Sequence, residues 1–325
     1  MSFGLTFIQT IRNVLNGQPC DKGTILAPVR GTTQLRQVAL STGEHHCVFV
    51  ESHLADSGNH FARGWPIVVI NLMPCLPFVH HSAAHPESDG DVGLQAAALF
   101  EQSGSRSLVV SSVRRDAVSE SRSQCESHYH PTDGAHDNTT MFHAANMAVW
   151  QWQTGIVGAC HLDNCTFIQW HGKANTSCSH SSAFISAGLR NESRIYDTHA
   201  IPAERLKSAI RRKWSGTNLT ADSVYDTDCR LLATSNVFGR RINGYNVSQT
   251  CDLHGPENGT GSFLHIEQSW QSMSRDQYRN WAAAIRETFG APWSHKHEIF
   301  MRKYWPIYPV SGLLTILAFA WWFTR

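Results

Sequence analysis

Two short apolar segments, IVVINL at 67–72 and SLVVSS at 107–112, constrain the fold of this chain most strongly. Each has the length of one strand, is rich in apolar residues and lacks strict alternation of apolar and polar residues. Strands of this kind are buried on both faces, which requires helices on both sides of the sheet. The sequence therefore predicts an α/β protein, a three-layer sandwich with a mixed, mainly parallel sheet.

The other elements are placed by their apolar period and by turn residues. Strands are expected at 47–50, 66–72, 107–112, 166–170, 230–234 and 263–266, and helices at 92–102, 137–152, 203–214 and 275–289. No internal repeat is visible. We expect a poorly defined N-terminal segment (1–45), an α/β domain (46–291), a linker (292–304) and a C-terminal hydrophobic helix (305–323).

The composition excludes two classes of protein. Lys and Arg number 27 and Asp and Glu number 26, so no basic excess indicates a nucleic-acid partner. The chain is 42% hydrophobic and 16% charged, which rules out general disorder. Its 325 residues are enough to bury a large core, and its 19 histidines make it a His-rich globular protein.

Residues 305–323 form an apolar run without a charged residue, between Lys303 and Arg325. Such a run is close to the roughly 20 residues that cross a bilayer as a helix. Pro306 and Pro309 shorten the safe helical part to about 14 residues, which leaves a removed lipid-anchor signal and a buried terminal helix as alternatives. We expect a single-pass C-terminal membrane anchor.

The sequons and cysteines indicate the secretory pathway or the cell surface. Seven Asn-x-Ser/Thr sequons occur, against roughly two or three expected by chance. The candidate glycosylation sites are Asn138, Asn164, Asn175, Asn191, Asn218, Asn246 and Asn258. Nine cysteines allow up to four disulfides with one thiol left over. For the closest pair, Cys160 and Cys165, a local disulfide or two buried thiols are favoured over a metal or redox role.

The first candidate site lies at 80–91, between an apolar stretch and a predicted helix. Imidazole and carboxylate groups on one loop can converge on a divalent ion, so His85 and Asp89 are candidate metal ligands. In the alternative interpretation Asp89 or Asp91 caps the helix and His85 is a surface histidine.

A second cluster, at 127–143, places Asp133, His136 and His143 at the entry to a predicted helix. His136 and His143 are seven residues apart and share a helix face, and a helix N-terminus favours anions such as a substrate carboxylate. Alternatively Asp133 or Asp137 caps the helix and His143 lies in the core.

Two further apolar strands end in polar groups. His171 closes one of them and is followed by Gly172, at the sheet edge where open α/β proteins bind ligands. On the other, Glu267 shares a face with His265 and is placed to act as a general base. The alternatives are a structural His171 and a Glu267 that is salt-bridged to a helix Arg.

Taken in chain order, these motifs resemble N-formylglutamate amidohydrolases and zinc carboxypeptidase-like hydrolases, including strings found in secreted bacterial and fungal proteins. The likeness spans about residues 65–290 and rests on His85-Pro…Asp89, Arg114-Arg115, Asp133-Gly-Ala-His136, Gln-Trp-His171-Gly, His-Ile-Glu267 and Arg275. It implies a phosphorylase/hydrolase-like form of the sandwich.

The resemblance also implies roles for single residues. His85, Asp89 and His171 would hold Zn²⁺, with Glu87 as a rival to Asp89. Glu267 would activate water, and Arg114 or Arg115 would grip a substrate carboxylate. The supporting or substrate-contacting residues would be Asp133, His136, His143 and Arg275.

The function implied is a metal-dependent hydrolase, anchored to a membrane, that cleaves an amide or peptide-like bond near a carboxylate. The substrate would be a small molecule or peptide-like. Because Val113-Arg-Arg stands where the resemblance leads us to expect His-Arg, the alternative is a non-catalytic membrane-anchored surface protein that retains the fold.

A serine hydrolase is disfavoured because no Gly-x-Ser-x-Gly motif occurs. A sugar-binding module is disfavoured because Trp150, Trp152 and Trp170 lie in apolar runs.

Overall fold

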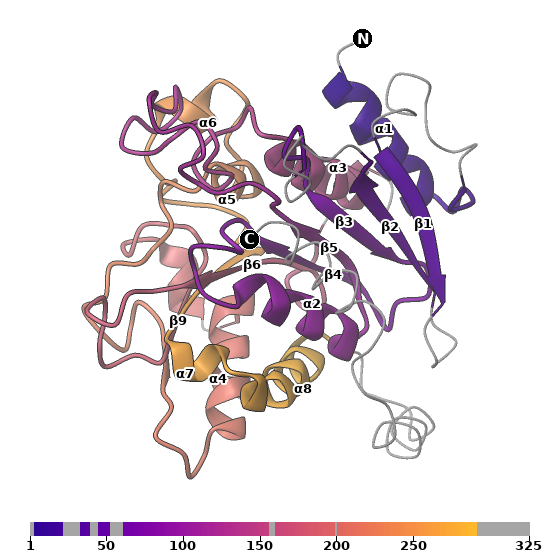
Figure 1. Ribbon diagram of the computed structural model, residues 1–325. Coiled ribbons are helices and arrows are strands. Elements are labelled where there is room, and N and C mark those ends of the chain that lie inside the picture. Colours follow the sequence, from indigo (N-terminus) through magenta and orange to yellow (C-terminus); the bar gives the residue numbers. More distant parts are fainter. Residues whose placement is uncertain are drawn as a thin grey trace.

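One nine-stranded sheet forms the centre of the described chain (Figure 1). The computed structural model describes residues 3–21, 33–39, 45–52, 61–155, 160–198 and 200–290. The strands are β1 (Thr33–Ala39), β2 (His45–Glu51), β3 (Ile67–Asn71), β4 (Leu76–Ala83), β5 (Ser105–Val110), β6 (Thr166–Gly172), β7 (Ala183–Ser186), β8 (Ala221–Asp222) and β9 (Phe263–Gln268). Their order across the sheet is β1-β2-β3-β5-β4-β6-β9-β7-β8.

The middle of the sheet is parallel and its flanks are mostly antiparallel. Strands β5, β4, β6 and β9 pair in parallel, as do β7 and β8, whereas β1, β2, β3 and β5 pair antiparallel and β7 runs antiparallel to β9. The predicted α/β protein with a mixed sheet is confirmed. Because β4, β6 and β9 are parallel neighbours, the loops that follow them leave the sheet at one edge.

Helices cover both faces of this sheet. They are α1 (Phe3–Leu15), α2 (Val92–Ser103), α3 (Met141–Gly155), α4 (Pro202–Lys213), α5 (Val237–Ile242), α6 (Gln249–Asp252), α7 (Trp270–Met273) and α8 (Tyr278–Phe289), with 3₁₀ turns η2 (Arg194–Thr198) and η3 (Arg275–Gln277). Helices α2, α4 and α8 share one hydrophobic core and α1, α3 and α5 share the other (Figure 1). Strand β3 sends Ile67 and Val69 to the first core and Val68 and Ile70 to the second, as expected of a strand buried on both faces.

Helix α3 begins later than the sequence pattern predicts, at Met141 instead of Asp137. The Asp137 carboxylate accepts a hydrogen bond from the backbone N–H of Thr139 at 2.8 Å. Such a bond, from a side chain to the backbone two residues later, stabilises a turn and competes with helix formation. The four residues before Met141 therefore remain outside the helix.

No strand forms at 230–234, where the sequence predicted one. Leu231 and Leu232 instead pack with Phe184 in a small separate cluster. The apolar side chains of this segment are thus buried without pairing to the sheet, and an apolar composition alone does not distinguish such a loop from a strand.

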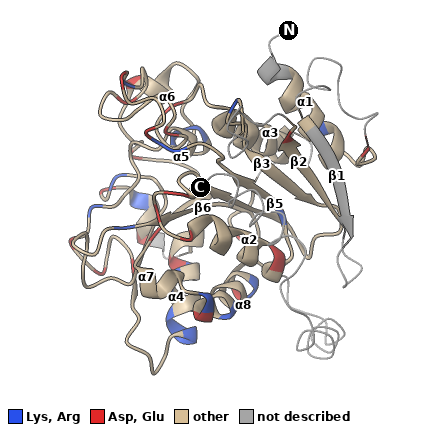
Figure 2. Ribbon diagram, viewed as in Figure 1, with Lys and Arg blue, Asp and Glu red and all other residues tan. Residues whose placement is uncertain are grey.

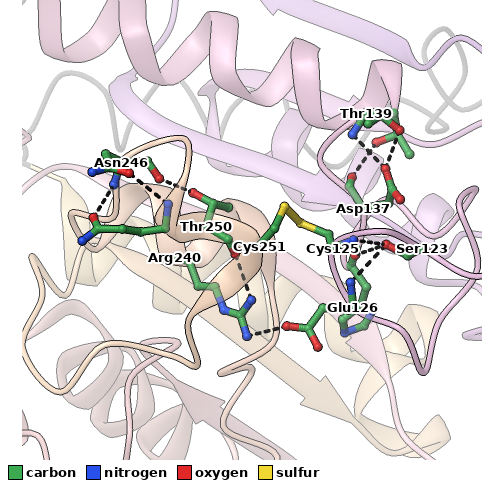
Figure 3. Close-up of a disulfide and its surroundings, with 12 residues drawn as sticks. Ser123, Cys125, Glu126, Asp137, Thr139, Arg240, Asn246, Thr250 and Cys251 are labelled. Atoms are coloured by element: carbon green, nitrogen blue, oxygen red, sulfur yellow. Dashed lines mark hydrogen bonds and ion pairs between the residues drawn. A yellow bond between two sulfur atoms is a disulfide. The ribbon is translucent and has the colours of Figure 1, made fainter.

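Four disulfides link the described segments: Cys20–Cys47, Cys125–Cys251, Cys160–Cys165 and Cys178–Cys229. Cys75 remains as an exposed thiol, so the predicted limit of four disulfides with one thiol left over is reached. The Cys125–Cys251 bridge joins residues 126 positions apart. It lies close to the buried guanidinium of Arg240, which pairs with Glu126 at 2.5 Å (Figure 3).

The surface of the described chain mixes charges of both signs (Figure 2). An example is the contact of α4 with α8, where Arg212 and Lys213 both pair with Glu287. All seven sequon asparagines are exposed or half-buried. Among the described helices, none combines the length and the hydrophobicity that crossing a bilayer requires. The expected linker and anchor, 292–323, lie outside the described residues.

Candidate metal centre

The candidate site lies where β4, β6 and β9 end. His85 and Asp89 follow β4, while His171 is near the end of β6 and Glu267 near the end of β9. His171 and Glu267 occupy matching positions on their adjacent parallel strands. Segments that are far apart in the sequence therefore deliver their polar side chains to one edge of the sheet.

His85, Asp89 and His171 form the first group of possible metal ligands. The Oδ2 atom of Asp89 lies 3.3 Å from Nδ1 of His85 and 3.2 Å from Nδ1 of His171. The two imidazole ring centres are 5.0 Å apart, and all three residues are buried. Two imidazole nitrogens and one carboxylate oxygen are the donor set of many catalytic zinc sites.

The loop after β4 offers two carboxylates, and the structure brings only one of them to the two histidines. Asp89 belongs to the group described above, and the backbone N–H of Gly172 also lies 3.4 Å from its Oδ2. Glu87 is half-buried and is not a member of any group of metal donors found among the described residues. The geometry therefore favours Asp89 over Glu87.

Asp133 lies on the other side of the His85 ring. Its Oδ1 is 2.8 Å from Nε2 of His85 and 2.9 Å from Nδ1 of His136, and it accepts from the backbone N–H of Ala135 at 3.1 Å. The other oxygen accepts from Nε of Arg115 at 3.1 Å. His85, Asp133 and His136 form a second possible donor group, but this carboxylate is already surrounded by donors. Its contacts place it against the ring nitrogen of His85 that faces away from Asp89.

The structure separates the two adjacent arginines. Arg115 pairs with Asp133 at 3.0 Å and lies 3.7 Å from Asp89, so its guanidinium adjoins the cluster. Arg114 is exposed and pairs with Asp116 at 3.0 Å. Of the two arginines that the resemblance offered, only Arg115 is positioned next to the candidate ligands.

Two other predicted residues, His143 and Arg275, make no recorded contact with the candidate ligands among the described residues. His143 is buried on α3, and its ring makes an edge contact with Phe238 at 6.3 Å. Burial lowers the pKa of His143 to about 4, so it is a neutral core histidine. Arg275 is exposed in the 3₁₀ turn before α8.

His265 joins the cluster although the sequence assigned it no role. Its ring centre is 4.5 Å from that of His171, and its Nε2 is 3.6 Å from Oε1 of Glu267. These three residues form a third group whose donor atoms lie within 4.8 Å of one another. The alternation of β9 already placed His265 on the same strand face as Glu267, which is the signal that could have found it.

Ionisation in the cluster follows from burial and from the neighbouring charges. Burial raises the pKa of Glu267, and the charge of Asp89 adds to this, so its pKa lies at about 8. Burial lowers the pKa of His171 to about 4. Burial also disfavours the charged form of His85, but hydrogen bonds to Asp133 and Asp89 outweigh it and raise the pKa to about 9.

Each ring nitrogen of His85 and of His171 has an acceptor oxygen as its neighbour. His171 faces the Gln169 amide oxygen at 2.9 Å and the Asp89 carboxylate at 3.2 Å, and its pKa of about 4 makes it neutral at pH 7. A neutral imidazole carries one N–H, so one of these contacts brings two acceptors together. His85 faces a carboxylate at both nitrogens, and its raised pKa of about 9 means that without a metal it is protonated and donates to both. A cation beside Nδ1 of His171 and the Asp89 carboxylate would relieve the opposition at His171, and its binding would displace the proton from Nδ1 of His85, so the residues present fit a metal ion.

The raised pKa of Glu267 predicts a pH-dependent effect on the metal-free protein. Its folded pKa of about 8 lies above the ordinary glutamate pKa of 4.5. The stability that its neutral form contributes is therefore fully present below about pH 4.5 and is lost as the pH rises through 8. The difference in unfolding free energy between Glu267→Gln and wild type should therefore change by about 3–4 kcal/mol in favour of the variant from pH 5 to pH 8, because only the wild type loses stability as Glu267 ionises. Denaturant titrations with a chelator present measure this difference; a difference that does not change with pH contradicts the prediction.

Comparisons with known proteins add little to this geometry. No family model matches the sequence, and no curated protein matches it. Among solved structures, the crystal structure of gene product Atu2144 from Agrobacterium tumefaciens is similar at a TM-score of 0.31 and 12% identity. The match covers 66% of this chain and 87% of that chain. The functional interpretation therefore rests on the site itself.

Proposed function

We propose that the protein is a zinc-dependent hydrolase that cleaves an amide or peptide-like bond next to a carboxylate. The convergence of His85, Asp89 and His171, with two acceptor atoms opposed between His171 and Asp89, supports this most directly. A cation would fit there, at the sheet edge where Glu267 and Arg115 also lie. The resemblance of the sequence motifs to N-formylglutamate amidohydrolases and zinc carboxypeptidase-like hydrolases points to the same class.

In this proposal Nδ1 of His85, Nδ1 of His171 and a carboxylate oxygen of Asp89 hold the ion. When bound, a zinc ion supplies Lewis-acid activation of water and of the substrate carbonyl at neutral pH. Asp133 holds the His85 ring from behind through Nε2, and Gln169 does the same for His171. The protein thus fixes both rings before the ion arrives.

The reaction itself requires a base, an acid and a group that stabilises developing negative charge. Glu267 accepts a proton from water as the oxygen attacks the amide carbon, and then donates it to the amine as the C–N bond breaks. A pKa that burial has raised to about 8 suits a group that both takes and returns a proton near neutral pH. The Arg115 guanidinium, next to Asp89, would stabilise the oxyanion or bind the substrate carboxylate.

The compartment is also a proposal. Disulfides persist in oxidising environments, and four of them occur in the described chain. All seven sequon asparagines are accessible enough to carry glycans. We propose a glycoprotein of the secretory pathway or cell surface, anchored through residues 305–323.

The proposed function predicts one bound zinc ion per chain. Elemental analysis of protein purified without chelator should find equimolar zinc, and a chelator should remove both the zinc and the hydrolysis of N-acyl amino acids. His171→Ala should lose the ion because it removes one of three ligands, whereas His180→Ala, at an exposed histidine, should keep it. A purified protein that neither contains zinc nor binds added zinc would contradict the proposal.

A further inference from the structure

A buried contact holds the His171 ring on the side that faces away from Asp89. Gln169 and His171 are two residues apart on β6, so their side chains leave the same face of the sheet. The Gln169 Oε1 atom lies 2.9 Å from His171 Nε2, and both residues are buried. A glutamine amide can present an oxygen or an NH₂ group, and each choice selects a different tautomer of the imidazole.

Asn236 determines which end of the Gln169 amide faces His171. The Asn236 Oδ1 atom accepts from the backbone N–H of Gly239 at 2.8 Å, which makes Asn236 the N-cap of α5. With its oxygen occupied by the cap, Asn236 turns its NH₂ group to Gln169 and donates to Oε1 at 2.5 Å. An amide oxygen has two lone pairs, so Gln169 Oε1 can accept from both neighbours.

The Gln169 nitrogen shows what this orientation costs. Its Nε2 is buried, and no hydrogen-bond partner for it is present among the described residues. A buried amide N–H without a partner destabilises the fold. The reversed amide would place its NH₂ group against that of Asn236, which is worse, because two donors would then face each other in a buried space.

We infer that Asn236 is a positioning residue that acts through Gln169 to keep the proton of His171 on Nε2. Neutral His171 then presents the lone pair of Nδ1 to the metal side, 3.2 Å from the Asp89 carboxylate. The consequence for metal binding rests on the proposed function, but the choice of tautomer does not.

The turn that contains Asn236 is also linked, through Ala135, to Asp133, which contacts His85. The backbone N–H of Val237 donates to the carbonyl oxygen of Ala135 at 2.9 Å. Ala135 in turn donates its own N–H to Asp133, the carboxylate behind His85. The start of α5 therefore contacts Gln169 directly and is linked to Asp133 through Ala135.

The variant Asn236→Asp tests the inference with little change of shape. An aspartate keeps an oxygen for the Gly239 N–H, and with it the cap, but turns an acceptor to Gln169. The Gln169 amide should then rotate, present its NH₂ group to His171 Nε2 and drive the imidazole proton to Nδ1. Side-chain ¹⁵N NMR of metal-free protein above pH 7 should show the Nε2–H form of His171 in wild type and the Nδ1–H form in the variant.

Zinc affinity gives a second readout, measured by competition with a chromophoric chelator. We expect Asn236→Asp and Gln169→Leu each to weaken zinc binding by about 10- to 100-fold, the usual effect of losing a partner behind a ligand. Gln169→Glu should retain affinity, because a carboxylate still accepts from both Asn236 and His171. The matched control is Asn280→Asp, which breaks a similar amide contact between Asn280 on α8 and Gln277 in η3 (2.9 Å). This variant should change neither the His171 tautomer nor the zinc affinity.

The outcomes separate the two proposals. If wild type binds no zinc, the metal-dependent function fails, while the NMR comparison still decides the inference. If Asn236→Asp keeps the Nε2–H form of His171, or binds zinc as tightly as wild type does, Asn236 has no positioning role. An unchanged melting temperature in Asn236→Asp confirms that the cap and the fold have survived.

Discussion

Replacing Glu267 with Gln should lower the turnover of an N-acyl amino acid by about 10³-fold while zinc remains bound. The change preserves the size and burial of the side chain but removes the group that accepts the proton from water. In the proposed site Glu267 adjoins the ligands without being one of them, so its loss should spare the metal. Steady-state kinetics and elemental analysis on the same preparation measure both effects.

The matched control for this prediction is Glu287→Gln, at a half-exposed glutamate on α8 that pairs with Arg212 and Lys213. It makes the same chemical change away from the cluster and should leave turnover within a factor of about two. Full activity in Glu267→Gln would remove its role as the base. Loss of zinc together with turnover would instead show that Glu267 is a ligand.

The layered α/β architecture could be predicted because apolar strands that bury both faces leave few alternatives. Strand β4 escaped prediction because its sequence, LPFVHHSA, places His80 and His81 inside the protein. Burial lowers the pKa of both histidines to about 3, so they are neutral. Each ring has a serine hydroxyl partner on the neighbouring β5, at 2.8 and 3.0 Å. Such partners come from another strand, and no pattern within β4 reveals them.

In the candidate site too, some contacts could be expected from the sequence and others arise only when distant segments fold together. The approach of His85 and His171 was expected from the resemblance of the motifs, and the structure explains it by the parallel neighbours β4 and β6, which end at one edge. The choice between Arg114 and Arg115 depended on which side chain the loop turns toward Asp133, 18 residues later in the chain. The Asn236–Gln169 contact spans 67 residues, and only folding brings the two amides together.

The largest stability effect that we predict is the loss of the Cys125–Cys251 bridge. The double variant Cys125→Ala/Cys251→Ala should lower the unfolding free energy by about 4–5 kcal/mol. The bridge closes a long loop in the unfolded chain between residues 126 positions apart, part of which the Cys160–Cys165 and Cys178–Cys229 bridges already close. The buried pair of Arg240 and Glu126 next to it depends on the same two segments remaining in contact (Figure 3). Denaturant titrations with a chelator present measure the change without a contribution from bound metal.

The Cys160–Cys165 bridge provides the matched control, since its removal makes the same chemical change across a separation of only 5 residues. Its loss should cost about 2 kcal/mol by the same loop-closure argument, which leaves a difference of about 2–3 kcal/mol between the two double variants. Equal losses would show that native contacts around each bridge, and not loop length, set its contribution. A larger loss at Cys125–Cys251 than loop length explains would mean that the bridge also holds Glu126 against Arg240, and with it the loop that carries Arg115 and Asp133.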